Sequence, residues 1–229
     1  MSGVSQSPSS SAPEPVASDP QRGGRLLRTE AAAILPVLRA LPQSAFDTPT
    51  VLPGWSVRDV LAHCSAAFKG VTTGQLHDFS PASNEKDVAH RRNWSVEELL
   101  DELTLGYQSG AVAIDAVAPR LDALALGEWI HGGDIRDALG LAGAYASDGV
   151  DDALVLLADR SRARSLPPTD VTLTGPQTRV LRLGPSAGEA VATLQADPGN
   201  LFRLCAGRQP DPAGFTLTGA SAATYLVFN

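Results

Sequence analysis

Four segments between residues 25 and 140 carry apolar residues at the spacing of an amphipathic α-helix, and this pattern limits the fold more than any other feature. Two of the helices have a marked start, because Ser56 with Asp59 and Ser95 with Glu98 stand at the spacing of a capping box. Each helix has one apolar face, so the four faces must pack together. The four predicted helices cover residues 25–41, 56 to 71, 95 to 105, and 121–139.

The pattern becomes mixed after residue 145. One more helical pattern is followed by short β-rich runs separated by Gly and Pro, which are typical of strands and turns. The sequence therefore predicts an α+β protein, with an N-terminal four-helix bundle over 25–145 and a small C-terminal α/β domain over 146–229. The further predicted helices are 151–163, 187–194 and 200–206, and the predicted strands are 171–174, 179–183, 215–218 and 225–228.

Composition restricts the setting and the partners. Residues 1–24 are rich in Ser, Pro and Gly and have no aromatic side chain, which predicts a disordered tail. The formal net charge is −7 and no basic block occurs, which argues against nucleic acid as a partner. No apolar run is long enough to span a membrane, and Cys64 and Cys205 form no disulfide framework. We expect a cytoplasmic monomer or homodimer with reduced thiols and a small-molecule substrate.

Polar side chains interrupt two of the apolar helix faces. On a helical wheel, Glu128 and His131 lie in the middle of the stripe of 121–139, and Asp134 follows one turn later. His63 lies at the edge of the stripe that begins at residue 56. If these helices face each other, two imidazoles and one carboxylate can converge. Three protein ligands leave an open position for water or substrate, as in catalytic zinc sites.

Each of these residues also has an ordinary interpretation. His63 could be a hydrogen-bonded histidine at the edge of the core, and Glu128 could pair with Arg136 or Arg120. His131 and the aspartate three residues later could form a plain intrahelical pair. The consecutive glycines 132 and 133 predict a close approach by a neighbouring helix or a ligand, since each costs about 1 kcal/mol relative to Ala in a helix. We interpret the remaining polar and aromatic side chains as core or packing residues (Cys64, Cys205, Trp55, Trp129) or as solvated residues (His77, His90).

Two motifs resemble one known family. Residues 52–63, LPGWSVRDVLAH, resemble the opening motif of the mycothiol-dependent maleylpyruvate isomerase family, and residues 128–140, EWIHGGDIRDALG, resemble its second signature. Residues 201–218 resemble a segment of the small C-terminal domain of that family, which has a sterol-carrier-like fold. The resemblance covers 25–229 and implies a DinB-like four-helix bundle.

The resemblance also implies a metal site. A divalent metal, usually zinc, would be held by His63, by His131 and by an acid, with functional roles for Asp134 and Arg208. The chain departs from the family pattern at the acid, which usually lies four residues before the second histidine, where this sequence has Gly127. Glu128 stands three residues before that histidine and is our predicted third ligand, although the offset turns its side chain by about 100°.

The site predicts thiol chemistry. A divalent cation deprotonates a thiol that coordinates it. The chain has no well-placed cysteine, so the sulfur would come from a cofactor, which the resemblance to the family implies is mycothiol or a similar low-molecular-weight thiol. Asp134 would orient His131 or bind the cofactor, and Arg208 or Arg136 would bind the cofactor or a substrate carboxylate.

The expected function is a metal- and thiol-cofactor-dependent, mycothiol-type isomerase or S-transferase that acts on a small electrophilic substrate. The alternative is a non-catalytic small-molecule-binding or resistance protein with a degraded metal site. A third possibility is a structural or partner-binding protein in which Glu128 and His131 are satisfied internally.

Overall fold

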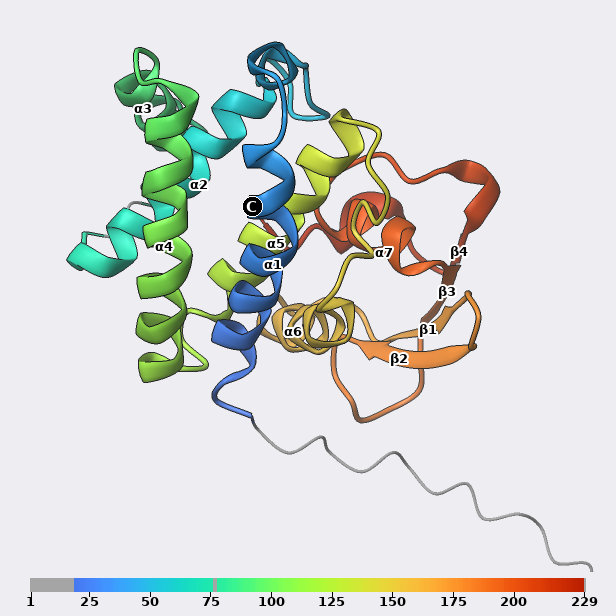
Figure 1. Ribbon diagram of the computed structural model, residues 1–229. Coiled ribbons are helices and arrows are strands. Elements are labelled where there is room, and N and C mark those ends of the chain that lie inside the picture. Colours follow the sequence, from blue (N-terminus) through green and yellow to red (C-terminus); the bar gives the residue numbers. More distant parts are fainter. Residues whose placement is uncertain (1–18, 76–77, 229) are drawn as a thin grey trace, which may run out of the picture.

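The computed structural model describes residues 19–75 and 78–228, and its first half is a helical bundle (Figure 1). All four predicted helices are present, and α1 packs along α4 and α5 while α2 packs along α4. A shorter helix, α3, packs against α2. The helices of this half are α1 (Arg22–Arg39), α2 (Val57–Thr73), α3 (Pro81–Arg91), α4 (Val96–Val117) and α5 (Asp122–Ala138), with a 3₁₀ turn at Gln43–Asp47.

Both predicted capping boxes form. The Ser56 hydroxyl accepts from the backbone N–H of Asp59 at 3.4 Å, and the Asp59 carboxylate accepts from the backbone N–H of Ser56 at 2.9 Å. Ser95 and Glu98 make the same pair of bonds, at 3.1 and 2.6 Å. The first box fixes where α2, the helix that carries His63, begins.

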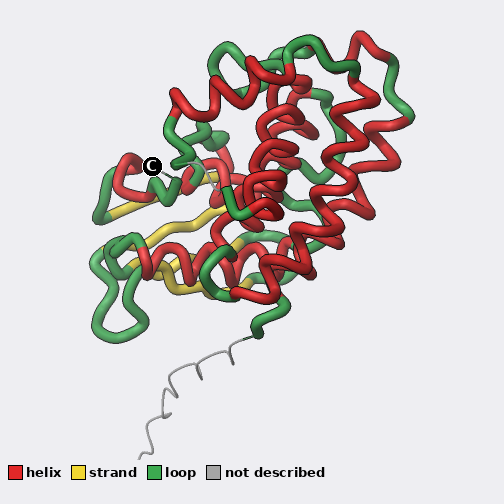
Figure 2. Tube along the Cα trace, turned by 90° about the vertical axis from the view of Figure 1, so that its left-hand side faces the viewer, coloured by secondary structure: helices red, strands yellow, loops and turns green. Residues whose placement is uncertain are grey.

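The second half is a small sheet with helices beside it (Figure 2). The strand order is β2-β1-β3-β4, with β1 antiparallel to β2, β1 parallel to β3, and β3 antiparallel to β4. This arrangement confirms the predicted α+β class. The elements are α6 (Val150–Ala163), β1 (Thr169–Leu173), β2 (Arg179–Leu183), β3 (Ala192–Ala196), α7 (Pro198–Cys205) and β4 (Phe215–Thr218), with 3₁₀ turns at Pro212–Gly214 and Ala222–Tyr225.

Two predictions for this half are wrong. The predicted helix 187–194 overlaps strand β3, in which buried Ala192, Leu194 and Ala196 alternate with exposed residues. That period of two matches pairing with β1 and overrides the helix propensity of the segment. The predicted strand 225–228 is not a strand. Its backbone joins no ladder: the Val227 N–H donates to the Cys205 carbonyl at 2.9 Å, and the Tyr225 hydroxyl lies 2.7 Å from the Thr169 hydroxyl.

The first half also differs from the prediction in detail. α1 begins at Arg22, so the predicted tail 1–24 ends in helical residues, while residues 1–18 lie outside the described residues. α3 is not among the predicted helices, and it carries His90, one of the predicted solvated residues. Ser80 caps the N-terminus of α3, and Pro81 is its first residue. Only Val88 and Arg91 of this helix are buried, so it has no apolar stripe by which to recognise it.

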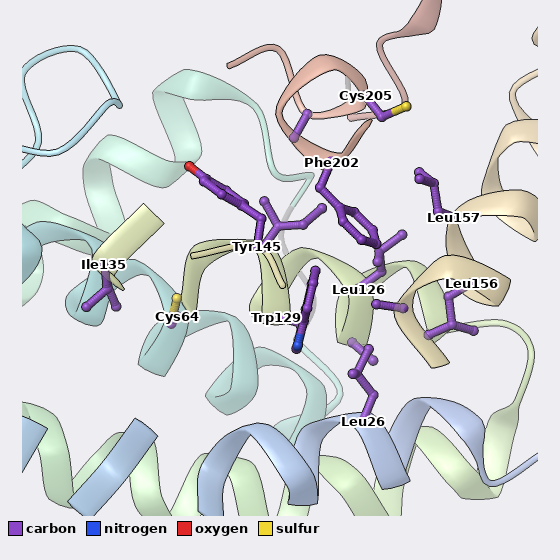
Figure 3. Packing of buried hydrophobic residues seen from close by; sticks show 14 of the residues in the cluster. Leu26, Cys64, Leu126, Trp129, Ile135, Tyr145, Leu156, Leu157, Phe202 and Cys205 are labelled. Atoms are coloured by element: carbon purple, nitrogen blue, oxygen red, sulfur yellow. The ribbon is translucent and has the colours of Figure 1, made fainter. Parts of the chain in front are cut away.

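One hydrophobic core runs through both halves (Figure 3). Trp129 of α5 lies edge-on to Phe202 of α7, with ring centroids 4.7 Å apart, so the bundle and the α/β part share a contact of two fully buried aromatic rings. Cys64 on α2 and Cys205 at the end of α7 are free and buried, as predicted for core residues. Among the helices of residues 19–75 and 78–228, none is long and apolar enough to cross a membrane.

Candidate functional site

Two histidines meet where α5 crosses α2. The rings of His63 and His131 lie nearly perpendicular, with centroids 5.1 Å apart, and Trp55 packs against His63 at 5.2 Å. Burial lowers the pKa of His63 to about 3, with a smaller contribution from His131, so its imidazole is neutral at neutral pH. The Nδ1 atom of His63 is buried and has no hydrogen-bond partner. The predicted meeting of the two histidines is therefore present.

Asp134 orients the second histidine. Its Oδ2 lies 2.9 Å from Nδ1 of His131, one turn earlier on the same helix. With Nδ1 bonded to a carboxylate, Nε2 is the ring nitrogen left to carry a lone pair or meet a ligand. Asp134 is fully buried, so it needs partners that keep it ionised.

Those partners come from two other segments. Arg208, in the turn after α7, donates from Nε to Oδ1 of Asp134 at 2.9 Å and from Nη2 to Oδ2 at 2.5 Å. The Tyr145 hydroxyl donates to Oδ1 at 2.7 Å. Burial alone would raise the pKa of Asp134, but the bonds from Arg208 and His131 outweigh it and hold the pKa well below its usual range.

The consecutive glycines of α5 make room for two different groups. A Cβ at Gly132 would lie 2.0 Å from Oε1 of Glu30, and a Cβ at Gly133 would lie 2.5 Å from the ring of Tyr145. Glu30, on α1, is fully buried and accepts from Nη1 of Arg136 at 2.5 Å. The predicted close approach at these glycines is thus confirmed, and protein side chains make it.

The two predicted arginines contact protein carboxylates. Arg136 is buried against Glu30, and Arg208 is bound to Asp134 and to the carbonyl oxygen of Ala206. The alternative pairing of Glu128 with Arg136 is therefore not made. A role for Arg136 or Arg208 in holding a cofactor or a substrate carboxylate stays a prediction.

Glu128 faces the core. It is 3% exposed, and its carboxyl group contacts the Cys64 thiol of α2. Burial raises the pKa of Glu128 to about 8, against a smaller opposing effect of the bond with Cys64. One carboxyl oxygen, Oε2, has no partner. Burial also raises the pKa of the Cys64 thiol, which agrees with its predicted role as a core residue.

The resemblance implies a metal held by three of these side chains, and the donor set can be compared with that expectation. His63 and His131 are adjacent, but Glu128 is directed to Cys64, and Gly127 offers no donor. Within residues 19–75 and 78–228, no group of three His, Cys, Asp or Glu side chains is arranged to hold a metal ion. The side chains as arranged therefore do not fit a three-ligand site.

Sequence reasoning missed two residues of this network, Tyr145 and Glu30. Tyr145 lies in the loop after α5 with a positive φ of 55°, and its ring stacks against the Arg203 guanidinium at 4.5 Å. No local pattern marks such a loop residue. The paired glycines were the only signal, because they required that something approach the helix. Of the predicted solvated histidines, His90 is exposed, and His77 lies outside the described residues.

The geometry defines a class of protein: a helical bundle in which two histidines meet where two helices cross. An aspartate orients one of these histidines, and an arginine of the α/β part binds that aspartate. Residues 27–140 match the Mycothiol maleylpyruvate isomerase N-terminal domain, about half of the chain. The chain belongs to this family.

Solved structures support the fold. The crystal structure of the mycothiol-dependent maleylpyruvate isomerase matches with a TM-score of 0.55 at 17% sequence identity, covering 89% of this chain and 95% of that chain. A mutant of that enzyme matches with a TM-score of 0.53 at 16% identity and the same coverage. No curated protein sequence matches this chain. The similarity therefore extends over both halves of the fold.

Proposed function

We propose that this protein is a thiol-dependent isomerase whose thiol is mycothiol or a similar low-molecular-weight thiol, and whose substrate is a small electrophilic molecule with an activated double bond. Family membership supports this class of reaction. The observation that carries the proposal is the bond of 2.9 Å between His131 and a buried, clamped Asp134.

His131 would act as the base for the thiol. The ionised Asp134 carboxylate accepts a hydrogen bond from Nδ1–H of His131, so Nε2 carries the lone pair that can take a proton from S–H. The ring of His63 lies beside it and is neutral, because burial lowers the pKa of His63 to about 3. The pair thus combines a base with an uncharged neighbour that can donate or accept a hydrogen bond.

The reaction follows from the properties of a thiolate. When bound as its thiolate, the cofactor would supply a nucleophile that adds reversibly to the activated double bond. Addition would leave a single bond that can rotate, and expulsion of the thiolate would give the other geometric isomer. Protonation before expulsion would instead give an S-conjugate, which is the transferase outcome of the same site.

The three predicted metal ligands are not arranged around one point. Two of the three predicted ligands, His63 and His131, are adjacent, and the third, Glu128, contacts Cys64. We therefore draw no step of the reaction through a metal ion. A cytoplasmic location remains part of the proposal, in keeping with two free cysteines.

The test is thiol-dependent turnover by the purified full chain. Maleylpyruvate with mycothiol is the first pair to try, since the similar solved structures are of an enzyme named for them. We expect isomerisation that requires the thiol. His131→Gln and Asp134→Asn should each lower kcat/KM by about 10²- to 10⁴-fold, the usual contribution of a general base and its support.

His90→Gln is the matched control, because His90 is an exposed histidine of α3 and should leave turnover unchanged. Full activity in a folded His131→Gln variant would contradict the assignment of the base. Thiol or substrate binding without turnover would favour the non-catalytic alternative.

A further inference from the structure

Position 127 of α5 has room for a side chain and lacks one. A Cβ there would have one neighbour within 4 Å, the Phe228 ring at 3.6 Å, which is an ordinary van der Waals contact. Gly132 and Gly133 are different, since a Cβ at either would overlap another side chain. Packing therefore requires glycine at 132 and 133 and does not require it at 127.

Position 127 also stands in register with the histidine pair. It precedes His131 by four residues, so the two positions lie on one helix face, one turn apart. Ligands at i and i+4 of a helix bind zinc together in known metal motifs. A carboxylate at 127 would thus start one turn from a histidine whose Nε2 is free of the Asp134 bond.

Glu128 does not replace it. Its side chain leaves α5 toward α2, where its carboxyl group contacts the Cys64 thiol inside the bundle. It is 3% exposed, less than half the value for His63. Its Oε2 atom has no hydrogen-bond partner, but within residues 19–75 and 78–228 it forms no three-residue ligand group with the two histidines.

We infer that this chain lacks the third protein ligand of a metal centre, and that Gly127 is the position at which the ligand is missing. The protein therefore offers a divalent cation two imidazoles and binds it weakly, whereas a glutamate at 127 completes a three-ligand site. The inference rests on the site of the proposed function and concerns only its need for metal.

The experiment measures zinc bound by the full chain. The untagged protein and its variants are incubated with zinc, passed through a desalting column and assayed by elemental mass spectrometry, and affinity is measured by competition with a chromophoric chelator. We expect the natural chain to retain far less than one zinc per chain. Gly127→Glu should retain about one and bind at least about 100-fold more tightly, a change at the upper end of that seen when even a supporting residue of a metal site is altered.

Three variants serve as controls. Gly127→Gln has a similar volume with a weaker ligand and should gain little, Gly127→Ala reports on folding, and Gly127→Glu with His63→Ala should lose the gained zinc. If Gly127→Glu unfolds, Gly127→Asp tests the same position with a shorter side chain. Retention of about one zinc by the natural chain would overturn the inference, and its loss in Glu128→Gln would make Glu128 the ligand. Failure of both acidic variants to tighten binding, when folded, would overturn the choice of position 127.

Zinc content does not depend on turnover. Thiol-dependent activity is measured separately on chelator-treated protein, so a failure of the proposed reaction and a failure of this inference give different results.

Discussion

Asp134 and Arg208 stand 74 positions apart in the chain and form an ion pair of two hydrogen bonds that joins α5 to the turn after α7. The pair is buried, with side-chain exposures of 0% for Asp134 and 11% for Arg208. A buried pair is costly to break from one side, because the remaining charge is left without a partner. The orientation of His131 in the first half thus depends on a residue of the second half.

Replacing Arg208 by Leu tests this dependence. We expect the free energy of unfolding to fall by about 3–5 kcal/mol, the usual cost of leaving one member of a buried pair. Asp134→Asn combined with Arg208→Leu should recover part of the loss. Arg39→Ala, which breaks the exposed pair with Asp101, is the control and should cost about 1 kcal/mol or less. Urea unfolding measures all four proteins, and equal losses for Arg208→Leu and Arg39→Ala would contradict a buried role.

Because of Glu128, the free energy of unfolding should decrease as pH rises. Its pKa is raised to about 8 in the folded protein, while the unfolded chain releases this proton near about 4.3. Between these values the folded state binds more protons, so the free energy of unfolding decreases as pH rises. Glu128→Gln removes this dependence, and its stability relative to the natural chain should increase by a few kcal/mol from pH 5 to pH 8.

Urea unfolding at several pH values measures the effect. Glu97→Gln is the control, because Glu97 is exposed on α4, and its pH profile should follow that of the natural chain. Parallel profiles for the Glu128→Gln variant and the natural chain would show that Glu128 ionises normally.

The glycines of α5 should differ in their tolerance of alanine. Gly127→Ala should be neutral or stabilise by up to about 1 kcal/mol, since alanine favours a helix. Gly132→Ala and Gly133→Ala should each destabilise by about 1–3 kcal/mol, because a Cβ would displace Glu30 or Tyr145. Thermal unfolding by circular dichroism ranks the three variants, and equal midpoints would be inconsistent with the close approaches.

Tyr145→Phe removes one hydroxyl that donates to the buried Asp134 carboxylate. Hydrogen bonds to charged groups contribute about 1.5–3 kcal/mol to stability, so we expect the free energy of unfolding to fall by an amount in that range. Tyr225→Phe is the matched control, since the Tyr225 hydroxyl pairs with the neutral Thr169 hydroxyl. This substitution should lower the free energy of unfolding by about 0.5–1.5 kcal/mol. Denaturant midpoints compare the stability of the two variants. A smaller loss of stability for Tyr145→Phe than for Tyr225→Phe would argue that the Tyr145 hydroxyl does not hold Asp134 in place.

Local signals in the sequence were enough to predict the bundle. The caps at Ser56 and Ser95 and the apolar stripes act within one helix, so they can be recognised in any window of the chain. The meeting of His63 and His131 was predictable for the same reason, because each lies on or beside an apolar face that had to be buried.

The missed features depend on partners far away in the chain. β3 is a strand because β1 lies alongside it, and Tyr145 is part of the site because Gly133 leaves space for its ring. The direction of Glu128 was decided by the packing of α5 on α2, which placed Cys64 within its reach. A helical wheel gives the angle of a side chain but not the neighbour that it meets.

The clamp on Asp134 has a consequence for how the chain can be divided. The match to the family domain ends at residue 140, and Tyr145 and Arg208, which hold the aspartate, both lie beyond that point. A fragment ending there would contain the histidines, but it would bury a carboxylate whose outside donors had been removed and would expose Trp129 where Phe202 now covers it. The N-terminal half is thus the part that the family domain matches, while the residues that hold Asp134 extend to residue 208.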